Sequence, residues 1–212
     1  VGDMATLAWA HIYGVFFLSS LVLARTLSDT LLVVPTNTVE IGKIALFGAL
    51  QAFVYFFAYR AFGKGKLALL NPIFSSYSGL VVVLSVIVFS EIIGGWQLAC
   101  LALIFFGIIS INLDQDSLAI KKIKIARMPG MKDILAATIL ASVWTVLWGH
   151  FVSGKDWLVY ASLMYGFMTI TILLLCMIQR IKLSVLSKDT WKFFFLIGLS
   201  EVIAYVGVSL GY

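Results

Sequence analysis

Residues 67–89 read LALLNPIFSSYSGLVVVLSVIVF, an apolar stretch without a single charged side chain. A helix of about 20 apolar residues crosses the ~30 Å hydrocarbon core of a bilayer, because each residue adds about 1.5 Å. The stretch is therefore long enough to span a membrane. Whether it belongs to a multi-pass protein depends on the sequence on either side.

Six further apolar runs of similar length occur in the 212-residue chain, at about 4–24, 42–62, 94–113, 133–152, 157–179 and 191–212. Hydrophobic residues make up 62% of the chain and charged residues only 12%, against about a quarter in an average globular protein. All 15 Lys and Arg residues lie between these runs or near their ends. The pattern predicts an all-α integral membrane protein with about seven transmembrane helices.

Several other classes are disfavoured. The runs are continuously apolar and do not alternate, which argues against an outer-membrane β-barrel. Cys100 and Cys176 lie alone in separate runs, so we predict no disulfide framework, metal site or cofactor. The net charge of +5 comes from the loops, where basic side chains favour anionic lipid headgroups as partners over nucleic acid.

Two parts of the chain resemble each other. Residues 46–63 (LFGALQAFVYFFAYRAFG) align with residues 196–212 (LIGLSEVIAYVGVSLGY) at an offset of 150. Three pairs then coincide, namely Gly48 with Gly198, Gln51 with Glu201, and Tyr55 with Tyr205. In the preceding runs Tyr13-Gly14 matches Tyr165-Gly166 at an offset of 152. The same order at nearly one offset predicts an internal duplication.

The duplication suggests how the chain is organised. We expect residues 1–113 to form a first repeat of five-helix type that lacks its first helix. Residues 114–132 form a basic connecting loop. Residues 133–212 then form a second repeat that is truncated after its third helix. A complete pair of such repeats holds ten helices, of which this chain has seven.

The stretch 58–113 carries a family resemblance. It reads AYRAFGKGKLALLNPIFSSYSGLVVVLSVIVFSEIIGGWQLACLALIFFGIISINL. Four of its features together resemble an EamA-type repeat of the drug/metabolite transporter superfamily. They are the helix end Ala-Tyr-Arg-Ala-Phe, the loop 63–66, Pro72 at the opening of the next helix and Glu91 at the end of that helix. Residues 133–212 resemble the opening helices of a second such repeat. The resemblance implies two inverted five-helix repeats, a central cavity and alternating access for small metabolites.

The orientation in the membrane stays open. Twelve Lys and Arg residues fall on one side of the predicted topology, and Arg25, Lys43 and Lys155 fall on the other. The positive-inside rule then places the N-terminus in the cytoplasm. The family pattern without its first helix places the N-terminus outside. We expect the plasma (inner) membrane in either case.

Glu201 is the acid that lies well inside a predicted span. It follows Trp191 by ten residues, which puts it about 15 Å deep. A carboxylate at that depth costs about 2.5–3.5 kcal/mol, so we expect Glu201 to face the bundle interior and to be able to hold a proton. Two interpretations remain open. Glu201 is either a proton-coupling group or a neutral side chain that joins two helices.

We expect the substrate pathway to include nine further residues. They are polar, aromatic or helix-breaking side chains inside the spans, namely Gln51, Tyr55, Tyr205, Asn71, Pro72, Ser75, Ser76, Trp144 and Trp148. Proline discontinuities commonly line transport sites, but Pro72 at the first helical turn is an equal alternative. Packing is the alternative for the aromatic side chains. Glu91 is interpreted as a structural helix-end residue.

Together these features predict a membrane transporter of small organic metabolites or drugs, with proton coupling as an open addition. Its partners are the lipid bilayer, a small-molecule substrate and, in one alternative, a second copy of the chain. A non-transporting or dimerisation-dependent membrane fragment is the main rival. A membrane-embedded enzyme is disfavoured, because the sequence has no zinc-type His-Glu-x-x-His motif and no paired acids inside the spans.

Overall fold

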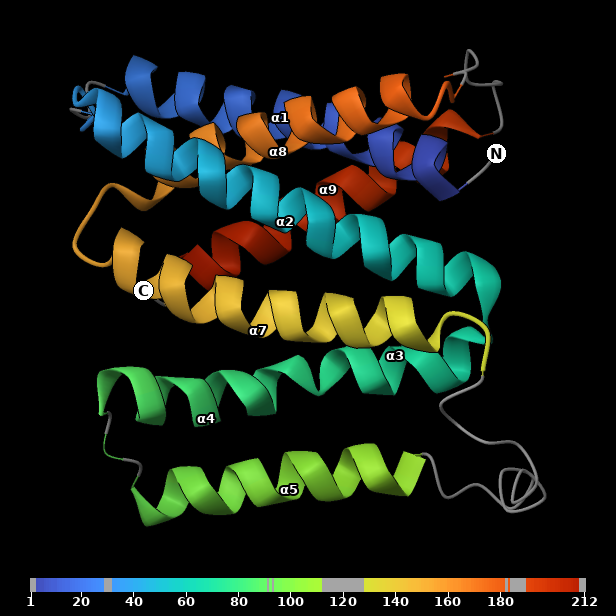
Figure 1. The fold of residues 1–212 in the computed structure, drawn as a ribbon. Coiled ribbons are helices and arrows are strands. Elements are labelled where there is room, and N and C mark those ends of the chain that lie inside the picture. The colour runs from blue at the N-terminus through green and yellow to red at the C-terminus, as the bar shows by residue number, and fades with distance from the viewer. Residues whose placement is uncertain are drawn as a thin grey trace. The chain divides into compact units, whose positions relative to one another are not determined.

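The computed structural model describes residues 3–28, 32–90, 92, 94–111, 128–181, 183 and 190–209 (Figure 1). Every regular element in this part of the chain is a helix. The helices are α1 (Asp3–Leu27), α2 (Thr38–Lys64), α3 (Leu67–Ser75), α4 (Tyr77–Phe89), α5 (Gly95–Ile111), α7 (Met131–Val152), α8 (Trp157–Ile178) and α9 (Trp191–Ser209). Each predicted apolar run is therefore helical over most of its described residues, and the run 67–89 is divided between α3 and α4.

Five helical stretches among the described residues are long and apolar enough to cross a membrane. They are Met4–Leu27, Thr38–Lys64, Leu67–Phe89, Met131–Val152 and Trp157–Ile178. Continuous helices of this kind satisfy their own backbone hydrogen bonds, which is what a segment surrounded by hydrocarbon requires. The chain is a multi-pass membrane protein.

The chain divides into two compact units. The first contains Val1–Ala52 and Trp148–Tyr212, and the second contains Phe53–Leu147. Both boundaries fall inside helices, α2 and α7. This division reflects which helices pack together, whereas the predicted division into residues 1–113 and 133–212 reflects the predicted duplication of the sequence. The duplication stays a prediction.

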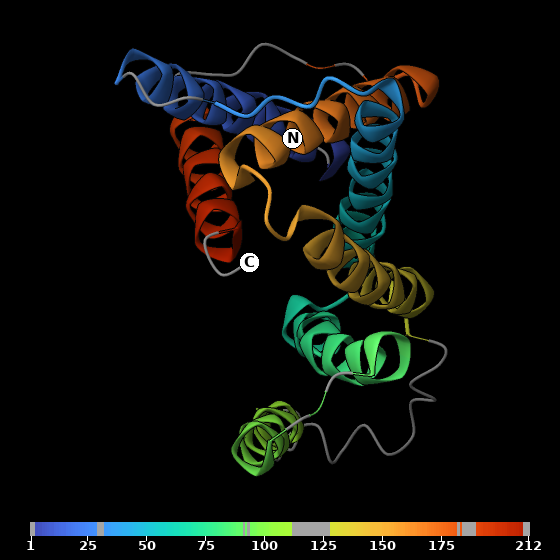
Figure 2. The same ribbon diagram turned by 90° about the vertical axis from the view of Figure 1, so that its left-hand side faces the viewer.

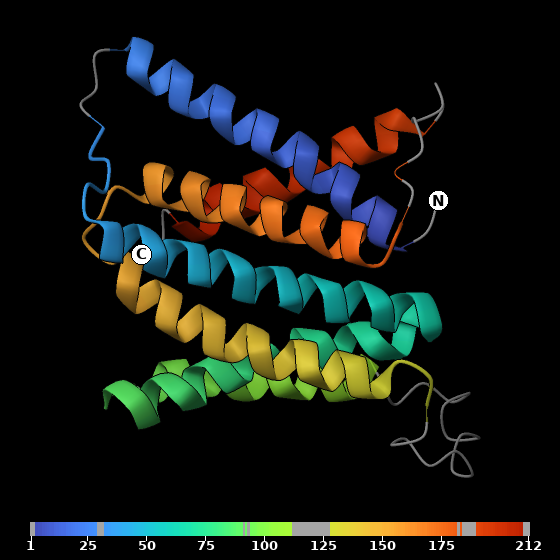
Figure 3. The ribbon, with the colours of Figure 1, turned by 45° about the horizontal axis from the view of Figure 1, so that its top comes forward.

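In the first unit, α1 packs against both α8 and α9 (Figure 3). Glycines permit the closest approaches. A Cβ atom on Gly198 of α9 would lie 2.7 Å from the Ala10 carbonyl oxygen of α1, and one on Gly48 of α2 would lie 2.6 Å from the Met164 carbonyl oxygen of α8. Small residues at helix crossings let two backbones approach in this way.

Ion pairs connect the helices at one end of the first unit. Lys155 and Asp156 are adjacent in the loop between α7 and α8, and each forms an ion pair with a residue of opposite charge. Lys155 pairs with Glu40 at the start of α2. Asp156 accepts a hydrogen bond from Arg25 at 2.9 Å and also caps α8 by accepting one from the Val159 backbone N–H. This loop therefore holds the end of α1 and the starts of α2 and α8.

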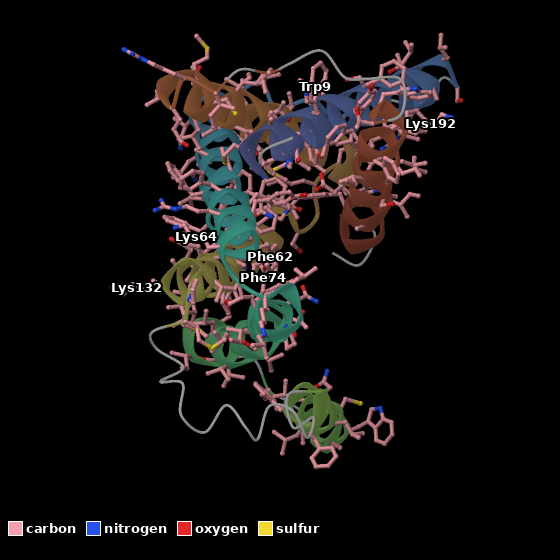
Figure 4. All side chains as sticks on the ribbon, turned by 90° about the vertical axis from the view of Figure 1, so that its right-hand side faces the viewer. Trp9, Phe62, Lys64, Phe74, Lys132 and Lys192 are labelled. Atoms are coloured by element: carbon pink, nitrogen blue, oxygen red, sulfur yellow. The ribbon has the colours of Figure 1, made fainter. Side chains whose placement is uncertain are left out.

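In the second unit, α3 and α4 follow each other almost end to end (Figure 1), and α5 contacts both of them (Figure 2). A small apolar core joins the end of α2 to α3 and α7. Its buried members are Ala61, Leu70, Met131 and Ile134. Phe62 and Phe74 extend this core as neighbouring side chains (Figure 4), with ring centroids 6.3 Å apart.

Gly130 is required at the entrance to α7. Its φ of +82° is unfavourable for other residues, and a Cβ atom there would lie 2.6 Å from the Ala61 carbonyl oxygen. Asp133, in the first turn of α7, binds Lys64 at 2.6 Å and lies 3.5 Å from Arg60. The start of α7 is thus fixed to the end of α2 by a close backbone approach and by ion pairs.

We expect Gly198→Ala to destabilise the first unit. The new methyl group meets the backbone of α1, which cannot rotate away as a side chain can, and overpacking of this kind costs about 1–3 kcal/mol. Thermal unfolding in detergent micelles measures the effect. Gly42→Ala in α2 is the matched control, because a Cβ atom there meets nothing within 4 Å. Equal melting temperatures for the two variants would show that the crossing of α1 and α9 is not tight.

Candidate functional site

Glu201 lies in the middle of α9 and is contacted from two other helices of the first unit. Its Oε2 atom accepts a hydrogen bond from Tyr165 Oη of α8 at 2.9 Å. The same oxygen lies 3.9 Å from His11 Nδ1 of α1. The His11 side chain is fully buried, whereas 15% of the Glu201 side chain is exposed. The carboxyl group therefore points into the helix bundle and keeps a small opening.

A second polar contact lies beside the first. Gln51 Nε2 of α2 donates a hydrogen bond to Tyr205 Oη of α9 at 3.0 Å. The ring of Tyr205 meets the ring of Tyr165 edge to face, with centroids 5.3 Å apart. Tyr165 in turn binds Glu201, so the tyrosine pair connects the two contacts. We refer to His11, Gln51, Tyr165, Glu201 and Tyr205 as the carboxyl cluster.

The local sequence of α1 makes room for this arrangement. A Cβ atom on Gly14 would lie only 2.2 Å from Tyr165 Oη, so the hydroxyl reaches Glu201 because residue 14 has no side chain. One turn earlier, the His11 ring stacks on the Tyr165 ring with centroids 5.2 Å apart. His11 Nδ1 also lies 2.9 Å from the Leu7 carbonyl oxygen. Tyr165 is therefore packed against the backbone at Gly14 and against the ring of His11.

The cluster is acidic and aromatic. In the part of the chain that the structure describes, His11 is the one basic side chain within ion-pair distance of Glu201. The described part of the chain contains no group of three His, Cys, Asp or Glu side chains that could hold a metal ion. A carboxyl group with one hydroxyl donor and aromatic neighbours can hold a proton or attract a cation.

The break between α3 and α4 forms a second polar region, in the second unit. The Ile73 carbonyl oxygen accepts hydrogen bonds from Ser76 Oγ at 2.6 Å and from Thr138 Oγ1 of α7 at 3.3 Å. Ser142 Oγ of α7 donates to the Tyr77 carbonyl oxygen at 3.3 Å. Hydroxyl groups of α7 thus supply donors to backbone carbonyls on both sides of the break.

Pro72 is the sixth residue of α3 and lies inside the helix, which begins at Leu67. The interpretation that Pro72 stands at a first helical turn is therefore wrong. A proline in a helix interior removes the backbone hydrogen bond to the carbonyl oxygen four residues earlier, here that of Ala68, and so weakens the turn that precedes it. The break at Ser76 lies four residues after Pro72, on the other side of the proline from this weakened turn.

The structure describes other surroundings for the remaining predicted pathway residues. Tyr55 and Trp144 belong to the second unit, where Tyr55 lies near Tyr59 and Trp144 is buried. Trp148 is buried in the first unit and packs on Phe47, with centroids 5.3 Å apart. Of the α3 residues, Asn71 and Ser75 are exposed. Glu91 lies outside the described residues.

Sequence reasoning missed His11 and Tyr165 as site residues. Tyr165 had a usable signal, because Tyr165-Gly166 aligns with Tyr13-Gly14 in the predicted repeat. His11 had none, since one histidine in an apolar run has no recognisable spacing. Thr138 and Ser142 were also missed, although residues four apart share one helix face.

An open groove also runs between α1 and α8. Its volume is about 490 Å³, and it is lined by apolar residues such as Leu23 and Phe167 with the hydroxyl groups of Ser19 and Ser162. None of its lining residues belongs to the carboxyl cluster. The groove is therefore separate from the site around Glu201.

No protein-family model, curated protein or solved structure matches this chain. Its function therefore has to be argued from the geometry of these residues and from their sequence pattern.

A double-mutant cycle tests the bond between Tyr165 and Glu201. We expect Tyr165→Phe and Glu201→Gln to be coupled by about 0.6 kcal/mol, and by at most about 1.7 kcal/mol, the range measured for hydrogen bonds between membrane helices. Equilibrium unfolding in mixed micelles gives the four free energies. Pairing Tyr165→Phe with Glu40→Gln should give no coupling. Additive effects in the first cycle would contradict the hydrogen bond.

The hydroxyl contacts at the helix break give a second prediction. Thr138→Val should lower the free energy of unfolding by about 0.6–1.7 kcal/mol more than Thr145→Val does. Thr145 donates only within α7, to the Ala141 carbonyl oxygen, whereas Thr138 also donates to Ile73 of α3. Both variants lose a hydrogen bond within α7, so the comparison cancels the free energy of that bond. The same unfolding assay applies, and equal losses would show that the contact with α3 adds nothing.

Proposed function

We propose that the chain is a membrane transporter of small organic metabolites or drugs that works by alternating access, with Glu201 as its proton-coupling group. The observation that carries the proposal is the carboxyl group of Glu201 in the middle of α9, in contact with side chains of α1 and α8. Ionisable side chains inside membrane spans are costly and mark ion or substrate pathways by default. No covalent chemistry is needed for this function.

The surroundings of Glu201 suit a group that gains and loses a proton. Tyr165 donates its hydroxyl hydrogen to the carboxylate form, which offsets part of the cost of a charge in hydrocarbon. The exposed part of the side chain gives the proton a way in and out. A proton-coupled transporter requires a site with both properties.

The packing of two glycines supports the proposal of an inverted repeat. Gly48 and Gly198 are equivalent in the alignment at offset 150, and α1 and α8 are equivalent at offset 152. Gly48 packs on α8 beside Met164, and Gly198 packs on α1 beside Ala10. Each proposed repeat therefore places the same glycine against the equivalent helix of the other. A pseudo-two-fold axis between inverted repeats produces such an exchange.

This exchange fits the EamA-type pattern that residues 58–113 and 133–212 resemble. On that basis we propose that the chain belongs among the drug/metabolite transporters and resides in the plasma (inner) membrane. The ion pairs of Arg25 and Lys155 are consistent with a sorted charge distribution, because they neutralise two of the three cations on the less basic side.

Glu201→Gln tests the proposal directly. The purified chain is placed in proteoliposomes with a pH gradient and a defined mixture of amino acids, nucleosides and amines, and mass spectrometry follows what accumulates inside. Gln has the shape of a protonated Glu but cannot release a proton. We therefore expect gradient-driven accumulation to be abolished, while exchange of preloaded compounds continues.

Glu40→Gln is the matched control, since it makes the same chemical change at a helix end, where Glu40 binds Lys155. It should leave both modes of transport unchanged. If Glu201→Gln removes exchange and gradient-driven accumulation equally, proton coupling through Glu201 is rejected. If the unaltered chain moves no compound in either mode, the transport function itself is rejected.

A further inference from the structure

Every charged side chain that the structure describes in the second unit lies at the junction of three helix ends. The end of α2 meets the start of α7 (Figure 4), where Lys64 binds Asp133. The loop before α3 meets the loop before α7, since a Cβ atom on Gly65 would lie 2.5 Å from the Pro129 carbonyl oxygen. The cations at this junction, which we call the basic patch, are Arg60, Lys64, Lys66 and Lys132.

The basic patch carries more positive charge than the described residues balance. Asp133 is the one Asp or Glu residue described in the second unit, and one of its oxygens serves both Lys64, at 2.6 Å, and Arg60, at 3.5 Å. Lys66 and Lys132 are exposed and form no ion pair with a described residue. Four cations beside one acid favour an anionic partner at this junction.

The position of the patch along the helices indicates which anion it meets. Three of the stretches that are long enough to cross a membrane begin or end there, namely Thr38–Lys64, Leu67–Phe89 and Met131–Val152. The ends of spanning helices lie at the level of the lipid headgroups, and basic sites between such ends attract anionic lipids. The negative charges nearest to the patch in a membrane are therefore those of phospholipid headgroups.

Apolar side chains continue from the cations toward the middle of the helices. Lys132, Leu135 and Ile139 are all exposed, and spacings of three and four residues put them on one face of α7. On α2 the Arg60 guanidinium lies over the ring of Phe56, one turn earlier, at 5.9 Å from the ring centroid. Each helix thus has a cation near its end and apolar surface below it, which matches the headgroup and acyl chains of a lipid.

We propose that the basic patch binds an anionic phospholipid, whose headgroup is attracted by the four cations and whose acyl chains lie along the apolar face of α7. A zwitterionic phospholipid has the same phosphate group but also a cation, which the patch repels. A soluble phosphate ester has the anion but no acyl chain to cover Leu135 and Ile139. The site is independent of the carboxyl cluster and does not require the chain to be a transporter.

Native mass spectrometry of the full chain in detergent micelles tests the site, since each bound lipid adds its own mass. Palmitoyl-oleoyl phosphatidylglycerol and palmitoyl-oleoyl phosphatidylcholine have the same acyl chains, so their comparison isolates the headgroup charge. We expect the first phosphatidylglycerol to bind with a Kd lower by about tenfold or more, because each nearby basic side chain contributes about fivefold for an anionic lipid. Equal Kd values would overturn the proposal, and this comparison uses the unaltered protein.

The double variant Lys66→Gln/Lys132→Gln tests whether the lipid binds at the patch. It leaves both ion pairs of Asp133 in place, so the contact between α2 and α7 is kept. We expect the Kd for phosphatidylglycerol to rise about 25-fold, which is about fivefold for each lysine. Lys43→Gln/Lys192→Gln is the matched control, because it removes the same charge from two exposed lysines of the first unit and should leave this Kd unchanged.

An equal rise in Kd for the two double variants would show that the lipid follows the overall charge of the chain, and it would overturn a site at the patch. Glycerol 3-phosphate provides the last comparison, because it carries a phosphate group without acyl chains. We expect the bound phosphatidylglycerol to remain in place when millimolar glycerol 3-phosphate is added. Complete displacement would overturn the lipid as the occupant and assign the patch to a soluble phosphate.

Discussion

The hydrogen bond between Tyr165 and Glu201 is the interaction around which the first unit is arranged, because a carboxyl group inside an apolar helix has to find its partners within the protein. Three features of the neighbouring helices serve this contact. Gly14 leaves the space through which the tyrosine hydroxyl passes, Gly198 brings α9 against α1, and His11 covers the ring of Tyr165. The close packing of α1, α8 and α9 is thus concentrated where the polar groups meet.

Two kinds of polar contact hold the helices, and their places follow from the cost of charge in a bilayer. Full ion pairs occur at helix ends, where Lys155 meets Glu40 and Lys64 meets Asp133, because water and headgroups solvate them there. Inside the helices the donors of the described contacts include hydroxyl and amide groups, as where Thr138 donates to the Ile73 carbonyl oxygen and Tyr165 donates to Glu201. These inner bonds are individually weak, so the helix positions depend mainly on side-chain packing.

The helices could be predicted because a long apolar segment in a bilayer has to satisfy its backbone internally, and this makes the sequence signal strong. Gln51 contacts Tyr205 of α9, four residues after Glu201, whereas Tyr55 belongs to the other unit, and the repeat alignment stays a prediction. The break at Ser76 was not predicted, because hydropathy is unchanged across it. His11 was missed because its value lies in contacts with α8 and α9, far away in the sequence.

The geometry of the cluster bears on the two interpretations of Glu201 that the sequence left open. A side chain that only joins helices is expected to use its hydrogen-bonding capacity within the protein, as Thr138 and Ser142 do by donating to carbonyl oxygens of both their own and a neighbouring helix. Glu201 uses one oxygen and leaves the other without a described donor, and Gln51 has an unused oxygen in the same cluster. The buried Gln51 oxygen costs stability because it has no donor, whereas the Glu201 side chain keeps some exposure. Glu201 thus differs from Thr138 and Ser142, whose hydroxyl groups are committed to carbonyl oxygens of the protein, and this difference is compatible with the proposed exchange of a proton.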